Sequence, residues 1–224
     1  MTFFTRFCLA LLCTFSLSSI HAGTVTLIKE TQQTRSTAEA TKLVWWMPNE
    51  FFIQSSQERG GSKKTLDETL ALIGDYAIFA VIDTKIGNFG TITAKTQSEV
   101  AASTHLLLNG KTRIEALNEA EIPEGVQTMT AILKPMFANM MGSLGKSFQF
   151  VVFKNRQDDG SLLIDASKTG SFTFMLSGDA FAWRLPLGSL LPVRFDPKTG
   201  EEFPGNYNFS PFSGDKLVLK PAAK

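Results

Sequence analysis

Cysteine is nearly absent from this sequence, and the two that occur, Cys8 and Cys13, lie close to the N-terminus. Both fall within an apolar run that we interpret as a secretory leader, so the mature chain is expected to contain none. Such a chain has no thiol nucleophile, thiolate zinc site, redox pair or disulfide. A mature length of about 200 residues is still enough to bury a large core without disulfide bonds.

Histidine and clustered charge are scarce as well. His105 is the only histidine beyond the leader, and no Gly-x-Ser-x-Gly motif supplies a serine, so we do not expect a Ser-His-Asp hydrolase. The 22 basic and 21 acidic residues are interspersed, without a basic stripe. Binding to nucleic acid needs clustered Lys and Arg to displace counterions. We therefore expect no nucleic-acid partner.

Residues 1–22 have the pattern of a secretory signal peptide. Arg6 precedes the apolar run FCLALLCTFSL, and small residues lead to an expected cleavage point near Ala22. The run is short for a membrane span, which needs roughly 20 residues, and an uncleaved anchor is the alternative. We expect a periplasmic or secreted protein with no transmembrane span after cleavage.

Hydrophobic patterning beyond the leader predicts an α+β fold, in which an antiparallel sheet packs on two helices within a domain of residues 23–191. The first helix is expected to open at Leu66 with Thr65 as its N-cap and to end at Gly74. The second is expected over residues 123–141, with a kink at Pro135.

Strand signals are distributed along the whole domain. Residues 76–83 are apolar at nearly every position, which predicts a central strand buried on both faces. The remaining expected strands are residues 24–28, 43–53 (a strand entering a turn), 91–93, 104–108, and two hairpins that pair 148–153 with 162–165 and 172–176 with 181–185. Residues 29–41 are expected to form a linker or surface element, residues 55–64 a polar loop and residues 98–103 a helical turn.

The end of the chain differs in composition, because six of the nine prolines lie beyond Leu185. This shift marks a boundary near Leu191 and a separate tail of residues 192–224. Within the tail, the stretches DPKTGEEF and SPFSGDKL repeat one Pro-x-x-Gly turn. The composition of the turns favours type I turns that begin at Asp196 and Ser210.

The spacing of the two turns resembles that of a zinc ribbon, whose two knuckles have the form Cys-Pro-x-Cys-Gly. The cysteine positions of that family hold Asp196, Thr199, Ser210 and Ser213 in this sequence. Hydroxyl groups are poor zinc ligands, so the resemblance implies a degenerate ribbon that binds no metal. We expect Phe203, Phe209 and Leu217 to hold the turns against the main domain. The remainder of the chain resembles bacterial exported proteins of unassigned function.

The stretch WWMPNEFF, residues 45–52, contains the candidate ligand-binding residues Trp45, Trp46 and Glu50. A carboxylate among aromatic rings is expected to have a raised pKa or a buried partner. The alternatives are that Glu50 caps a turn after Pro48 and that the aromatic residues are core. The wider set of candidate carboxylates is Glu50, Asp75, Asp83, Asp165 and Asp179.

Three functions are compatible with these features. The first is an exported, non-enzymatic binding or interaction protein whose partner is a protein or a small apolar ligand. The second is a carrier or sensor of an apolar ligand, which requires a cavity of several hundred Å³ near Trp45 and the methionine-rich helix. The methionines of that helix are Met129, Met136, Met140 and Met141. The third is an enzyme that depends on Glu50 and Asp83. No cofactor or metal is expected in any of the three.

Overall fold

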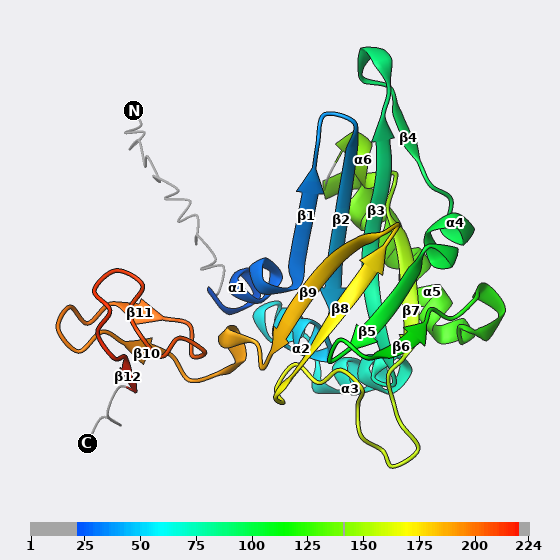
Figure 1. The fold of residues 1–224 in the computed structure, drawn as a ribbon. Helices are drawn as coiled ribbons and strands as arrows, with labels where there is room; N and C mark the ends of the chain where they lie inside the picture. Colours follow the sequence, from blue (N-terminus) through cyan, green and yellow to red (C-terminus); the bar gives the residue numbers. More distant parts are fainter. Residues whose placement is uncertain (1–21, 141, 220–224) are drawn as a thin grey trace, which may run out of the picture.

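The computed structural model describes residues 22–140 and 142–219 and shows an α+β protein built around strand β3 (Tyr76–Ile86) (Figure 1). The expected leader therefore lies outside the described residues, apart from Ala22. Residues 77–84 of β3 are buried without interruption, as the apolar run predicted. A strand with two buried faces needs a covering layer on each side of its sheet.

The first sheet is antiparallel and has β3 at its centre. Its other strands are β1 (Gln32–Ser36), β2 (Ala40–Met47), β4 (Ile92–Ala94) and β7 (Gln149–Lys154). One edge of β3 pairs with β2 along most of its length. The other edge pairs first with β7, from Tyr76 to Val81, and then with β4, from Thr84 to Ile86.

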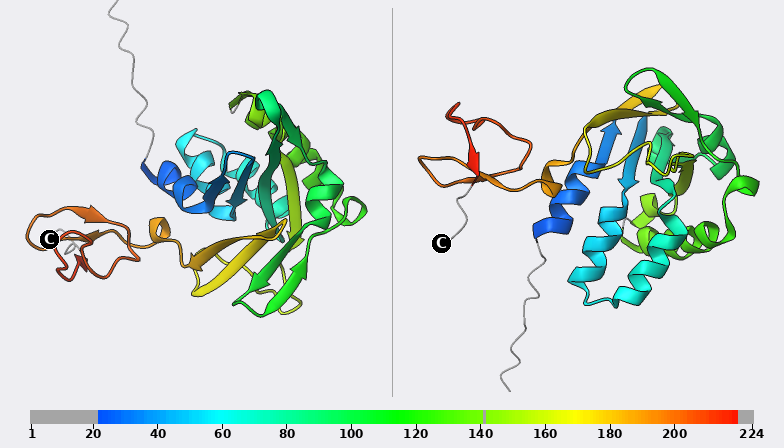
Figure 2. Two further views of the ribbon diagram at one scale, coloured as in Figure 1. Left: turned by 45° about the horizontal axis from the view of Figure 1, so that its top comes forward. Right: turned by 90° about the horizontal axis from the view of Figure 1, so that it is seen from below.

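A second antiparallel sheet covers one face of the first (Figure 2). Its strands, in spatial order, are β6 (Thr112–Glu115), β5 (Thr104–Leu108), β8 (Gly170–Leu176) and β9 (Asp179–Leu185). The core between the sheets is aromatic. Phe79 of β3 lies 4.6–6.4 Å, between ring centroids, from Phe153, Phe172, Phe174 and Trp183.

Helices cover the other face of the first sheet. Ile73 of α3 (Lys63–Ile73) and Val126 and Phe137 of α5 (Glu124–Met140) pack there with outward-facing residues of β2, β3 and β7. The remaining helices are α1 (Ala22–Thr31), α2 (Asn49–Glu58), α4 (Gln97–Ala102) and α6 (Gly142–Gly145), with short 3-10 turns η1 (Asn88–Gly90), η2 (Glu119–Glu121) and η3 (Gly188–Leu190). The predicted sheet on two helices is therefore confirmed, and the second sheet is an addition to it.

Residues 24–28 form part of helix α1, so the strand predicted there is wrong. Thr24, Leu27 and Thr31 are buried, which is the three-to-four-residue spacing of one helix face, while Val25 is exposed. The Thr31 hydroxyl also donates to the carbonyl of Leu27, 2.8 Å away. Residues 32–36, expected in a linker, form edge strand β1, whose polar side chains suit a strand with a solvated face.

The chain after Pro48 is helical, where a turn and a polar loop were predicted. Pro48 is the N-cap of α2, with φ −69°, and its ring favours the backbone geometry of a helix start. Helix α3 begins at Lys63, three residues earlier than predicted, because Ser62 rather than Thr65 is its N-cap. The Ser62 hydroxyl accepts a hydrogen bond from the Thr65 N–H, while the predicted end at Gly74 is confirmed.

One of the two predicted hairpins is confirmed and the other is wrong. Strands β8 and β9 pair through a turn at Ser177 and Gly178, both with positive φ. Strand β7 instead pairs with β3, because it is buried on both faces and suits the interior of a sheet better than an outer hairpin. Residues 162–165 keep only an isolated bridge, between Leu162 and Arg156.

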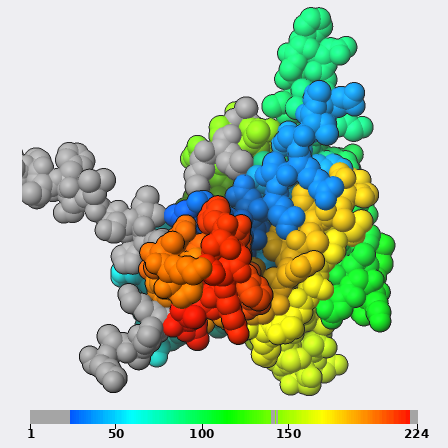
Figure 3. Space-filling view, turned by 60° about the vertical axis from the view of Figure 1, so that its left-hand side comes forward, coloured from blue at the N-terminus to red at the C-terminus, as the bar shows by residue number. Residues whose placement is uncertain are grey.

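Residues 192–219, here named the C-terminal module, contain three short strands. These are β10 (Arg194–Phe195), β11 (Glu202–Phe203) and β12 (Val218–Leu219). Phe203 and Leu217 are buried, whereas 59% of Phe209 is exposed, so the expectation that Phe209 packs on the main domain is wrong. The Phe203 ring stacks on Tyr207 of the same module. Figure 3 shows the module, in orange and red, on one face of the molecule.

We expect Phe79→Ala to lower the free energy of unfolding by about 4 kcal/mol, because it leaves a cavity among four aromatic rings. Leu72→Ala is the matched control, since half of Leu72 is exposed, and it should cost less than about 1 kcal/mol. Urea denaturation followed by tryptophan fluorescence measures both. Equal losses in the two variants would contradict the two-sheet core.

Candidate functional site

A groove of about 910 Å³ lies between α4, residues 115–122 and α5. Phe150 and Val152 of β7 form its floor. The groove exists because β7 pairs with a strand on only one edge, and α4 and residues 115–122 cover the other edge without filling the space. We call this site the α4–α5 groove.

Small and uncharged side chains dominate the walls of the α4–α5 groove. Ala101 and Ala102 face it from α4, and Ala131 faces it from α5. The polar lining consists of Thr96, Gln97, Ser98, Asn118, Gln127, Thr128 and Thr130, with Glu115, Glu119 and Lys134 as the charged residues. An apolar floor with polar groups above it is the usual construction of a site for a small molecule.

Hydrogen bonds hold the walls in place. The Gln97 side-chain amide donates to the carbonyl of Phe150, which ties α4 to β7. The Gln127 amide donates to the carbonyls of Glu119 and Ile122, at 3.0 and 2.8 Å, which ties α5 to η2. The walls of the groove are therefore fixed by hydrogen bonds between the protein's own residues.

The structure does not bring the predicted residues Trp45, Trp46 and Glu50 into one site. Trp45 and Trp46 are neighbours on β2 and so point to opposite faces of the sheet. Trp46 packs in the core between the sheets, against Phe172, and Trp45 packs on the helical face. Both indole rings are buried, and the Trp45 Nε1 has no hydrogen-bond partner in the described part of the chain.

Glu50 lies in the first turn of α2 and lines a hollow of about 20 Å³ with Trp46 and Asp165. Burial raises the pKa of Glu50, and the nearby Asp165 carboxylate raises it slightly more. A raised pKa is the shift that the sequence predicted for a carboxylate among aromatic rings. A hollow of this size holds about one water molecule, so it offers no space for a substrate.

The remaining candidate carboxylates lie in ion pairs. Asp75 pairs with Arg156, Asp83 with Lys95, Asp165 with Lys168, and Asp179 with Lys42 and Arg35. Glu50 and Asp83 cannot share a site. Glu50 follows Met47, which pairs with Ile78, and roughly 17 Å of strand separates Ile78 from Asp83.

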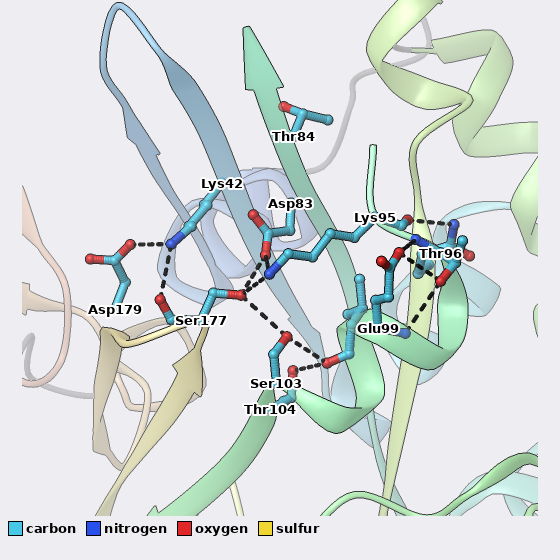
Figure 4. A network of polar contacts seen from close by, with 12 residues as sticks. Lys42, Asp83, Thr84, Lys95, Thr96, Glu99, Ser103, Thr104, Ser177 and Asp179 are labelled. Carbon is cyan, nitrogen blue, oxygen red and sulfur yellow. Dashed lines mark hydrogen bonds and ion pairs between the residues drawn. The ribbon is translucent and has the colours of Figure 1, made fainter. Parts of the chain in front are cut away.

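Asp83 is the centre of a buried polar network (Figure 4). Its Oδ2 lies 2.8 Å from Lys95 Nζ and accepts a hydrogen bond of 2.6 Å from the Ser177 hydroxyl. Lys95 also donates to the Ser177 hydroxyl, at 2.5 Å. The network joins β3 in the first sheet to the β8–β9 turn in the second.

A serine between a lysine and a carboxylate raises the possibility of nucleophilic catalysis, which needs a base to accept the serine proton. Here the Ser177 hydroxyl donates to Asp83 Oδ2, and Lys95 Nζ is paired with the same oxygen, so the three groups satisfy one another. Neither Ser177 nor Lys95 lines the α4–α5 groove. We therefore assign this network to stability.

His105 lies on β5, and its Nε2 is 3.2 Å from the Arg113 guanidinium. Partial burial, and then the Arg113 charge, lower the pKa of His105. Glu115 lies opposite His105 on β6, but no serine in the described residues hydrogen-bonds to the imidazole as a triad would require. Among residues 22–140 and 142–219 there is no cluster of three or more His, Cys, Asp or Glu side chains placed to hold a metal ion.

The C-terminal module contains two turns with the same hydrogen bonds. In the first, Asp196 Oδ1 accepts from the backbone N–H groups of Lys198 and Thr199, at 2.8 and 3.0 Å. The N–H of Gly200, a residue with φ +72°, donates to the Asp196 carbonyl. The positive φ explains why glycine ends the turn.

The second turn repeats this geometry fourteen residues later in the sequence. The Ser210 hydroxyl accepts from the N–H groups of Phe212 and Ser213, and the Gly214 N–H donates to the Ser210 carbonyl. The two turns face one another, because the Ser213 hydroxyl donates to Asp196 Oδ2 at 3.1 Å. These hydrogen bonds lower the pKa of Asp196, and the bond from the Thr199 N–H has the largest effect.

Comparisons with known proteins find no matching family model, no similar curated protein and no similar solved structure. No helix in the described ranges has the length and apolar character needed to cross a membrane. The α4–α5 groove was not predicted from the sequence. Its alanines and short polar side chains have no distinctive spacing, and the groove appears only when β7 is placed beside β3.

We expect Lys95→Ala to lower the free energy of unfolding by about 3 kcal/mol, because it leaves the buried Asp83 carboxylate without its cation. Lys64→Ala is the matched control. Lys64 pairs with Glu68 on an exposed helix surface, where the loss should be below about 0.5 kcal/mol. Urea denaturation at neutral pH compares the two, and equal effects would refute the structural role of the network.

Proposed function

We propose that the protein is a non-enzymatic binding protein of the periplasm or the extracellular space, and that its ligand binds in the α4–α5 groove. The groove itself carries the proposal. Its volume of about 910 Å³ suits a small molecule, and hydrogen bonds from Gln97 and Gln127 hold its walls. The location outside the cytoplasm rests on the leader pattern of residues 1–22.

The lining of the groove favours this function over the two alternatives. An apolar carrier was expected to use the methionines of α5, but Met129 packs on the helical core and Met136 does not line the groove. Met141 lies outside the described residues. An enzyme based on Glu50 and Asp83 lacks a shared site, and neither carboxylate faces the groove.

We expect Ala131→Trp to abolish ligand binding, because the indole ring would project from α5 into the groove. Native mass spectrometry of protein purified from its source cells would detect a co-purified ligand in the wild type and its loss in the variant. Ile132→Trp is the matched control, since Ile132 is the next residue on α5, is 60% exposed and does not line the groove.

Retention of the ligand by Ala131→Trp would place the binding site elsewhere. Loss of the ligand from both tryptophan variants would indicate damage to α5 rather than a blocked groove. Circular dichroism of both variants distinguishes these outcomes, because a damaged helix lowers the helical signal.

We also propose that the C-terminal module is a ribbon related to the zinc ribbon in which a carboxylate takes the place of the metal. Asp196 supports this proposal, because it accepts hydrogen bonds within its own turn and from Ser213 of the second turn. A metal ion would connect the same two turns through four side chains. The module is thus stabilised by a hydrogen-bonded carboxylate.

We expect Asp196→Ala to accelerate amide hydrogen exchange across residues 195–217 while leaving the main domain unchanged. In the wild type the lowered pKa of Asp196 means that its contribution to stability is complete above about pH 4 and is lost as the pH falls through the lowered pKa. Exchange should therefore also accelerate in acid. EDTA should have no effect, and one equivalent of bound zinc in purified protein would refute the proposal.

A further inference from the structure

We infer that the α4–α5 groove binds a neutral, hydroxyl-rich ligand, a short oligosaccharide, whose oxygen atoms accept hydrogen bonds from the backbone N–H groups of Phe150 and Val152. This inference rests on the proposed function, because it names the class of ligand for the same groove. The argument begins with the free edge of strand β7.

Alternate residues of β7 direct their backbone groups away from β3. The carbonyl of Val152 accepts a hydrogen bond of 2.8 Å from the Leu117 N–H, and the carbonyl of Phe150 accepts from Gln97. In an antiparallel pair the N–H and C=O of one residue point to the same side. The N–H groups of Phe150 and Val152 therefore also point toward the edge covered by α4 and residues 115–122.

The pairing with β3 does not use these N–H groups, and no other backbone carbonyl in residues 22–140 and 142–219 accepts from them. Phe150 and Val152 are only 6% and 1% exposed, and both line the groove. A backbone donor that lines a groove bonds either to water or to a ligand. A ligand in the groove that offers two acceptors about 7 Å apart, the spacing of alternate strand residues, would satisfy both.

A peptide strand does not fit this edge. Strand addition uses the carbonyl groups of the edge as well as its N–H groups. Here the Gln97 side chain and the Leu117 backbone already occupy the carbonyls of Phe150 and Val152. The edge of β7 therefore offers N–H donors, while its carbonyl groups are already bonded. This arrangement favours a ligand rich in oxygen acceptors.

The charges around the groove favour a neutral ligand. Glu115 forms an ion pair with Arg113, and the Lys134 ammonium donates to the Gln149 side chain, 2.9 Å away. Most of the polar lining is uncharged, with threonine and glutamine most frequent. An acyl chain would leave the two N–H groups without acceptors, whereas the hydroxyl oxygens of a sugar can accept hydrogen bonds from both.

The test is a titration of the ¹⁵N-labelled full chain, followed by two-dimensional NMR. The saccharide probes are maltotriose and N,N′,N″-triacetylchitotriose, and the comparison probes are tri-alanine and decanoate. We expect the amide signals of Phe150 and Val152 to shift saturably with at least one saccharide and with neither comparison probe. The shift should be lost in Ala131→Trp and kept in Ile132→Trp.

The possible failures can be distinguished. Shifts at the groove with tri-alanine or decanoate, and none with either saccharide, would overturn the ligand class and leave the proposed function standing. If a saccharide binds without moving the amides of Phe150 and Val152 but is still displaced by Ala131→Trp, the contact with the two N–H groups is overturned, while the ligand class and the proposed function stand. If all four probes leave the groove signals unchanged, and the wild-type protein carries no ligand from its source cells, both the ligand class and the proposed function fail.

Discussion

The burial of β3 on both faces is the constraint on which the rest of the structure depends. A single strand with apolar side chains on each side cannot end at a solvated surface, so the sheet around it needs two covering layers. The second sheet supplies one layer and α3 and α5 supply the other. The aromatic contacts of Phe79 and the buried Asp83 network then join the two sheets at different points along the same strand.

The α4–α5 groove follows from the way this central strand is paired. On its second edge β3 is shared between β7 and β4, so β7 ends the sheet at that point. Instead of another strand, α4 and residues 115–122 lie against the free edge and bond to its carbonyls. Because alanine side chains face one another across this region, the helices leave a space between them. Because α4 and residues 115–122 lie where a further strand would pair, the N–H groups of Phe150 and Val152 have no strand partner at the floor of the groove.

The C-terminal module shows how side-chain oxygens near the start of each turn can connect two short turns into one small structure. Each of its turns starts with a side-chain oxygen that accepts two backbone N–H groups, and each ends with a glycine at positive φ. The Asp196 carboxylate also accepts from the second turn, so a single anion satisfies donors from both. The module meets the main domain at η3, where the Gly205 N–H donates to the Gly188 carbonyl and the Glu30 carboxylate accepts from the N–H groups of Gly188 and Ser189.

The sequence by itself determined the features that depend on neighbouring residues. The buried run of β3, the β8–β9 turn, the end of α3 at Gly74 and the paired Pro-x-x-Gly turns all follow from local backbone preferences and hydrophobic spacing. Only the tertiary structure decided the partners of those elements. The spacing in residues 24–28 suits a strand or a helix until Leu27 meets the core, and the pairing of β7 with β3 joins residues about seventy positions apart. The candidate groove depends on that distant pairing, and so no local pattern could predict it.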